Sequence, residues 1–196
     1  MLEPAPDPPY PQSMDAYVYL RIAPGTMAEV LAGLASKQGI RRAVAVVGSW
    51  DVLLHAEGPD LKTIAKVVLS EIHFVPGVVK SMTAPVVPPD RIGITGFGGP
   101  KPPPIVADAC YVHIRAESGA AASIAEGLSE LPDVAGVAVL GGEWDLLTCV
   151  TQPWEIASGV ILDQIHQLPG ITSTSTLVSI EFREPDEDRD QFSGWN

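Results

Sequence analysis

A pattern that occurs twice constrains the fold of this chain more than any other feature. Residues 46–58 read VVGSWDVLLHAEG, and residues 139–151 read VLGGEWDLLTCVT. In both segments a β-branched run leads to glycine, a polar residue, tryptophan and aspartate, and a second apolar run follows. The chain must therefore build the same local structure at two places.

The similarity extends well beyond these two segments. When residue 17 is aligned with residue 111, an offset of 94, AYVYLRI aligns with CYVHIRA and GSWD with GEWD. Further along, an offset of 93 aligns EIHFVPGV with QIHQLPGI. We therefore predict an internal duplication, with a first module at residues 14–87 and a second at 109–183.

The segments outside the two modules lack the patterning of a packed core. Residues 88–108 are crowded with proline and glycine, which predicts an extended linker. Residues 1–13 are proline-rich and predict a flexible N-terminal segment, and residues 184–196 form an acidic tail. We expect both ends to be solvated extensions.

Each module predicts the element order β-α-β-β-α-β. Residues 16–22 alternate between aliphatic and amphipathic side chains, as in a strand with two different faces. Thr26 and Glu29 have the spacing of a capping box before an apolar helical stripe, and Asp60 is placed to cap a second helix. Pro76-Gly77 ends that helix before a last strand.

This order predicts an α+β fold of tandem ferredoxin-like modules. Right-handed crossovers bring both helices to one face of each antiparallel sheet and leave the other face bare. A module of this size with a bare sheet face is only marginally stable, so we expect the two sheets to pack face to face as a pseudo-dimer. One such packing brings together two sets of side chains: Tyr17, Tyr19 and Arg21, and Tyr111, His113 and Arg115.

Charge and composition exclude several classes of function. The chain has 12 Lys and Arg against 24 Asp and Glu, a net charge of −12, which disfavours direct nucleic-acid binding. No apolar run is long enough to span a membrane and the N-terminus lacks a secretory signal pattern, so we expect a cytoplasmic protein. The two cysteines, Cys110 and Cys149, lie in apolar strand-like segments and predict neither a disulfide nor a metal site.

The duplicated pattern resembles the C-terminal effector-binding (RAM) domain of the Lrp/AsnC family, a branch of the dimeric α/β-barrel superfamily. The resemblance is carried by the GSWDVLL or GEWDLL hairpin and by a helix that ends at PGV or PGI, in the same order in both modules. Only thirteen residues precede the first module, too few for the helix-turn-helix of such regulators. The resemblance thus implies effector binding and oligomerisation without DNA reading.

The resemblance also implies ligand-binding residues: Gly48, Trp50, Asp51, Gly142, Trp144 and Asp145. An aspartate would accept hydrogen bonds from an α-ammonium group, turn amides would bind a carboxylate, and tryptophan would cover the ligand. A purely structural interpretation remains open. In it, glycine shapes the turn, tryptophan fills a gap, and aspartate caps backbone amides.

From these observations we expect a protein that senses an amino acid or a related small metabolite, forms a homo-oligomer and modulates a full-length Lrp/AsnC regulator. We find no catalytic motif and expect no enzyme activity, no catalytic residue, no cofactor and no metal. We interpret His73 and His166, which recur before the Pro-Gly stops, as partners of helix C-termini. Two alternatives remain: a cofactor-independent enzyme of the α/β-barrel superfamily, and a purely structural assembly module.

Overall fold

The computed structural model describes residues 13–88 and 101–182, and each half has the element order that the sequence predicts. The N-terminal half contains β1 (Met14–Ile22), α1 (Met27–Ala35), β2 (Ile40–Val47), β3 (Val52–Gly58), α2 (Leu61–Val67), the π-helical turn η1 (Val68–Ile72) and β4 (Val78–Pro85). The C-terminal half contains β5 (Cys110–Ala116), α3 (Ala121–Glu130), β6 (Val134–Val139), β7 (Leu146–Val150), α4 (Trp154–Asp163), η3 (Ile165–Gln167) and β8 (Ile171–Ile180). The predicted N-terminal segment and acidic tail, and most of the linker with its GITGFGG sequence, lie outside the described residues.

The eight strands form one antiparallel sheet in the order β4-β1-β3-β2-β8-β5-β7-β6. The halves join where β2 pairs with β8, from Ala45 opposite Ile180 to Val47 opposite Val178. The two edges of the sheet, at β4 and β6, meet at a bridge between Val86 and Leu140, which closes the strands into a barrel. The predicted α+β fold class is confirmed.

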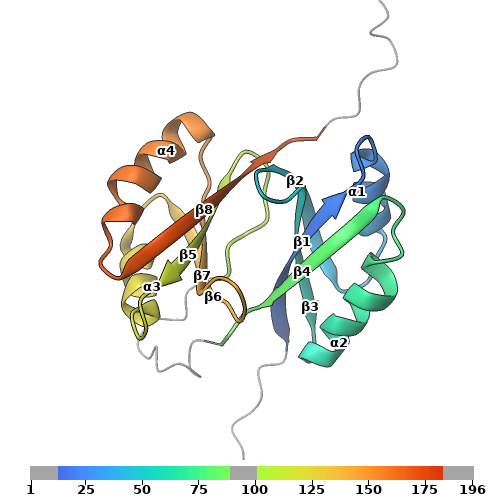
Figure 1. Ribbon diagram of the computed structural model, residues 1–196, viewed down its shortest axis with the longest axis horizontal. Coiled ribbons are helices and arrows are strands. Elements are labelled where there is room, and N and C mark those ends of the chain that lie inside the picture. Colours follow the sequence, from blue (N-terminus) through green and yellow to red (C-terminus); the bar gives the residue numbers. More distant parts are fainter. Residues whose placement is uncertain (1–12, 89–100, 183–196) are drawn as a thin grey trace, which may run out of the picture.

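Helices cover the barrel on opposite flanks, with α1 and α2 on one side and α3 and α4 on the other (Figure 1). In β1, Val18 and Leu20 pack toward the helices of their own half, whereas Tyr17 and Tyr19 belong to the cluster inside the barrel. The sheet is therefore apolar on both faces. Each half covers the face that the other would expose, which removes the instability expected of a single module.

Two predictions of helix capping have different outcomes. Asp60 caps α2 as expected, because its carboxylate accepts a hydrogen bond from the Thr63 backbone N–H at 2.7 Å. The capping box at Thr26 is wrong, since this side chain makes no capping hydrogen bond. Its hydroxyl donates instead to the carbonyl oxygen of Ala23 at 2.8 Å, so the turn that precedes α1 uses the group that would have capped the helix.

The two ends of the barrel differ. Every pair of neighbouring strands is antiparallel, so β1 and β5, which are four positions apart, run in the same direction. At the end where they begin, the Tyr17 hydroxyl donates to the Pro103 carbonyl at 2.8 Å and the Tyr111 hydroxyl to the Pro104 carbonyl at 2.9 Å. Ile105 is buried in the interior cluster. The second part of the linker thus plugs this end.

Candidate functional site

The opposite end of the barrel, where β1 and β5 end, carries both repeated hairpins. We call this end the barrel mouth and define it by residues 48–51, residues 141–145 and the side chains of Arg21, Lys80 and Arg115. The hairpin between β2 and β3 lies beside the end of β1, because Asp51 N–H donates to the Leu20 carbonyl at 2.9 Å. The six residues predicted from sequence therefore belong to one end of the barrel.

Both aspartates tie their hairpins to the neighbouring strand. Asp51 Oδ2 accepts from the Ile22 N–H at 2.9 Å, and its Oδ1 accepts from Arg21 at 3.2 Å. Asp145 Oδ2 accepts from the Ala116 N–H at 2.8 Å. Both aspartates therefore cap backbone amides, which is the structural alternative that the sequence left open. Within the described residues these bonds occupy both oxygens of Asp51 but only one oxygen of Asp145.

The two hairpin glycines have the same backbone conformation but different surroundings. Gly48 has φ +145° and Gly142 has φ +143°, a region that residues with a Cβ rarely adopt. A Cβ at Gly48 would also lie 2.7 Å from Leu177 Cδ2, whereas a Cβ at Gly142 would meet open space. The hairpin at Gly48 is therefore packed against β8, and the hairpin at Gly142 is free on that side.

Four aromatic rings form a row across the barrel, from Trp50 and Trp144 of the mouth to two buried rings between them. The ring centroids lie 6.0 Å apart for Trp50 and Tyr19, 5.1 Å for Tyr19 and His113, and 5.6 Å for His113 and Trp144. Tyr19 and His113 are equivalent at the offset of 94, and their side chains hydrogen-bond at 2.9 Å. This contact between the two halves confirms the face-to-face packing that the alternating strands indicated.

The hydrogen bonds of His113 fix its tautomer. Its Nδ1 lies 3.2 Å from the Ser175 carbonyl oxygen, which can only accept, so Nδ1 carries the proton. Nε2 therefore accepts from the Tyr19 hydroxyl. Burial lowers the pKa of His113 to about 4 and raises the pKa of Tyr19 far above its usual value. The pair is thus neutral near pH 7, with Tyr19 as the donor.

Cations lie near both tryptophans of the mouth. Arg21 and Lys80 approach the Trp50 ring at 6.0 and 5.6 Å, and Arg115 approaches the Trp144 ring at 4.9 Å. The two arginines also form exposed ion pairs, with Asp51 and Glu143 respectively. In the described part of the chain Lys80 has no carboxylate partner. The mouth therefore offers a positive group for an anion although the whole chain is acidic.

Sequence reasoning did not assign Lys80, Arg21, Arg115 or the Tyr19–His113 pair to the site. The arginines recur at the offset of 94 and follow the two aromatic residues by two positions, so their recurrence was an available signal. Lys80 aligns with Ser173 at the offset of 93 and does not recur. No signal in the repeat pointed to this lysine.

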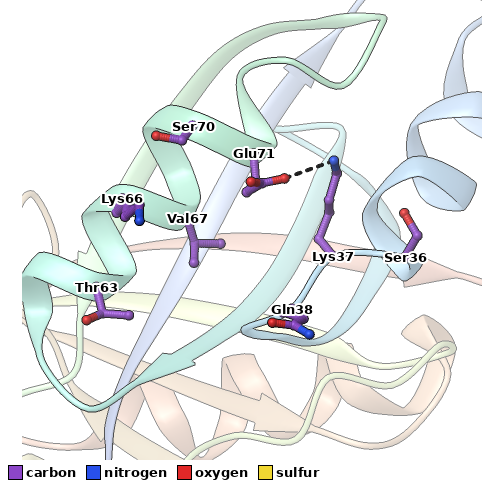
Figure 2. Close-up of a pocket in the computed structure, with 8 residues that line it drawn as sticks. All are labelled: Ser36, Lys37, Gln38, Thr63, Lys66, Val67, Ser70 and Glu71. Carbon is purple, nitrogen blue, oxygen red and sulfur yellow. Dashed lines mark hydrogen bonds and ion pairs between the residues drawn. The ribbon is translucent and has the colours of Figure 1, made fainter.

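A separate polar groove of about 450 Å³ lies between the end of α1 and the helix formed by α2 and η1 (Figure 2). It is lined by Ser36, Lys37, Gln38, Thr63, Lys66, Val67, Ser70 and Glu71. An ion pair of 3.0 Å between Lys37 and Glu71 spans it. The groove contains none of the predicted site residues. A smaller hollow of about 310 Å³ at the start of β4 includes Lys80 and borders the mouth.

The recurring histidines join helix ends to strands. His73 Nε2 lies 2.6 Å from Ser81 Oγ in β4, and His166 Nε2 lies 2.8 Å from Thr174 Oγ1 in β8. Both cysteines are free and buried. Within residues 13–88 and 101–182, no three His, Cys, Asp or Glu side chains gather into a potential metal site. None of the helices described there has the length and apolar character needed to cross a membrane.

A closed barrel of two βαββαβ halves with helices outside is the architecture of the dimeric α/β-barrel class. No protein-family model and no curated protein matches the sequence. Among solved structures, the siroheme decarboxylase NirDL is similar over 86% of this chain and 72% of its own, with 9% identity and a TM-score of 0.63. A second structure of that enzyme, with an iron-uroporphyrin III analogue, gives the same TM-score at 8% identity.

Other solved structures match a shorter part of the chain. The protein FFRP-DM1 matches 38% of this chain and 99% of its own, at 22% identity and a TM-score of 0.36. A transcriptional regulator of Neisseria meningitidis in complex with L-Met matches 38% of this chain and 49% of its own, at 20% identity and a TM-score of 0.36.

The expectation that the chain has no enzyme activity is wrong, because it rested only on the absence of familiar catalytic motifs. A decarboxylase has a fold that matches 86% of this chain, so this architecture can carry catalysis. At 9% identity the match establishes the fold and leaves the reaction open.

Proposed function

We propose that the barrel mouth binds one small carboxylated metabolite per chain, with an amino acid as the first candidate. The observation that carries this proposal is the position of Lys80 beside Trp50, without a carboxylate partner among the described residues. A ligand carboxylate there gains a charge-assisted hydrogen bond, and Arg21 and Arg115 at the same mouth add attraction. The tryptophans cover the rest of the ligand.

An amino acid also needs a partner for its ammonium group. Asp145 is exposed and uses only Oδ2 within the described structure, so Oδ1 can accept from an ammonium group. Asp51 already binds Arg21 and a backbone N–H. We therefore assign ammonium binding to Asp145 and a supporting role to Asp51. Gly48 and Gly142 shape the two hairpins that hold these groups.

A thermal-shift screen of the full chain against the common amino acids, each at millimolar concentration, tests this proposal. A ligand at about a hundred times its Kd adds roughly 2.7 kcal/mol to the free energy of unfolding, and so raises Tm by roughly 5–10 °C. Lys80→Gln should abolish the shift. Lys62→Gln, a change of an exposed lysine on α2, is the matched control and should preserve it. No shift with any amino acid would refute amino-acid binding.

Assembly and regulation are a finer part of the proposal, supported by the resemblance of each module to the Lrp/AsnC effector domain. We infer that the chain forms a homo-oligomer whose size responds to the ligand, and that it co-assembles with a full-length regulator. A ligand shifts such an equilibrium only by its different affinities for the two states. Light scattering with and without a ligand found in the thermal-shift screen tests this. An unchanged mass under ligand saturation would count against a regulatory role.

An acid–base enzyme is the second candidate, because a specific contact favours it. Beneath the two tryptophans, Tyr19 holds a phenolic proton against the unprotonated Nε2 of His113. Such an O–H···N contact can pass a proton to a bound substrate, and because burial moves both pKa values away from pH 7, we expect turnover near neutral pH to be slow. Each metabolite that binds should be incubated with the protein and its products followed by mass spectrometry. Loss of turnover in Tyr19→Phe with retained binding would support catalysis, and an unchanged metabolite would contradict it.

A further inference from the structure

One edge of β2 is only partly paired. The edge of β2 that faces away from β3 pairs with β8 at Ala45, Val46 and Val47. Along residues 40–44 no described strand pairs with this edge. We call this stretch the open edge of β2. Unpaired strand edges present N–H and C=O groups that readily accept another strand. The Ala43 N–H faces this edge, since it lies two residues before Ala45 on the same side of the strand.

The equivalent edge of β6 is covered by the chain itself. Val87 N–H donates to the Val139 carbonyl at 2.8 Å. In the repeat alignment this contact is the counterpart of the pairing of Ile180 with Ala45. Beyond that point the linker returns, and Val137 N–H donates to the Lys101 carbonyl at 2.9 Å. Val137 is the counterpart of Ala43 at the offset of 94. A Cβ on the adjacent Gly136 would lie 2.9 Å from Pro103 Cα, so the linker lies directly on β6.

The side chains of the open edge fit an acidic segment. Where β6 has Ala135 and Gly136, β2 has the exposed residues Arg41 and Arg42. Arg41 pairs with Glu57, and within the described residues Arg42 has no ion-pair partner. Beside them is a hollow of about 260 Å³, whose remaining lining is mostly aliphatic: Leu31, Ala35, Ile40 and Ala43. The surface thus combines positive charge with room for an apolar side chain.

The chain also leaves the barrel at this place. Strand β8 ends at Ile180, opposite Ala45, where the open edge begins. In the sequence that follows, residues 183–196 contain five carboxylates and two aromatic residues: Glu184, Asp186, Glu187, Asp188, Asp190, Phe192 and Trp195. The linker returns to β6 fourteen residues after Val87, and the same distance from Ile180 reaches residue 194. The C-terminal segment is therefore long enough to make the equivalent contact.

We propose that residues 183–196 bind the open edge of β2 as an added strand of the same chain. The Ala43 N–H donates to a carbonyl of this segment, as Val137 N–H donates to Lys101. The carboxylates of the segment face Arg42 and Arg41, and one of its aromatic side chains fills the hollow beside them. This contact is independent of the ligand proposed for the barrel mouth.

Hydrogen exchange of the full-length protein tests this contact at the Ala43 amide. We expect slow exchange in the wild type, and at least tenfold faster exchange in Arg42→Gln and in a chain carrying Asp186→Asn, Glu187→Gln and Asp188→Asn. High salt should accelerate exchange in the wild type, because the contact depends on charge. Lys62→Gln is the matched control and should leave the rate unchanged. An unchanged circular dichroism spectrum verifies that each variant folds.

Two results would overturn the proposal. Fast exchange at Ala43 in the wild type would show that the edge is open. Protection that persists in the tail variant and increases with protein concentration would assign the edge to a second copy of the chain.

Discussion

The buried histidine of the barrel makes the protein sensitive to acid in a defined pH range. His113 has an ordinary pKa near 6.5 and a folded-state pKa of about 4. Between these values the unfolded chain binds a proton that the folded chain excludes, so folding stability is lost as the pH falls from 6.5 to 4. The difference between the two pKa values corresponds to about 3 kcal/mol. For a chain of this length, this lowers Tm by about 6–12 °C.

Replacing the ring with a group that cannot titrate isolates this effect. His113→Phe should be less stable at pH 7, because the Tyr19 hydroxyl and the Ser175 carbonyl lose their hydrogen-bond partner. Each unsatisfied group costs about 1–3 kcal/mol of unfolding free energy. Its free energy of unfolding should nevertheless vary less between pH 7.5 and 4 than that of the wild type, by about 3 kcal/mol.

Urea unfolding at a series of pH values measures this difference. His166→Gln, which changes an exposed ring, is the matched control and should follow the wild type. Asp15 does not interfere, because its hydrogen bond with His55 holds the pKa of its carboxyl below the usual 3.8. The stability it contributes is lost as the pH falls from 3.8 through that lowered pKa, which lies below the compared pH range. Parallel curves for the wild type and His113→Phe would refute the assignment of His113 as the buried neutral group.

Two further predictions concern the hairpins and the linker plug. Gly48→Ala should destabilise the protein more than Gly142→Ala, by about 1–3 kcal/mol, because only the former adds overpacking against Leu177 to the backbone strain; equal Tm values for the two variants would contradict this. Tyr17→Phe should cost about 1–2 kcal/mol by leaving the Pro103 carbonyl unpaired in the interior, and should accelerate hydrogen exchange at Val137. Unchanged exchange would show that the plug does not depend on this bond.

The sequence was sufficient to predict the elements and the packing of the two halves. Alternating side chains separate Val18 and Leu20, which face the helices, from Tyr17 and Tyr19, which face the interior. The register of the repeat then places Tyr19 opposite its counterpart in the other half. These properties depend on local periodicity, and a single sequence records such periodicity directly.

Other properties depend on tertiary structure and were missed. The hairpins share one barrel mouth only because strand directions and barrel closure place them there. Lys80 joins the site through the pairing of β4 with β1, and Ser173 at the equivalent position removes the signal of recurrence. The composition of residues 88–108 predicted a linker. It did not predict that Pro103 and Pro104 would accept hydrogen bonds from buried tyrosines.

Calorimetric titration with an amino acid found in the screen tests the central claim most directly. We predict one bound ligand per chain, since both hairpins belong to one mouth. Affinity should fall at least tenfold in Lys80→Gln. Asp145→Asn should weaken binding of the amino acid but not of its analogue without the ammonium group, because Asp145 is assigned to that group. Two bound ligands per chain, or an affinity that neither substitution changes, would contradict a single composite site at the barrel mouth.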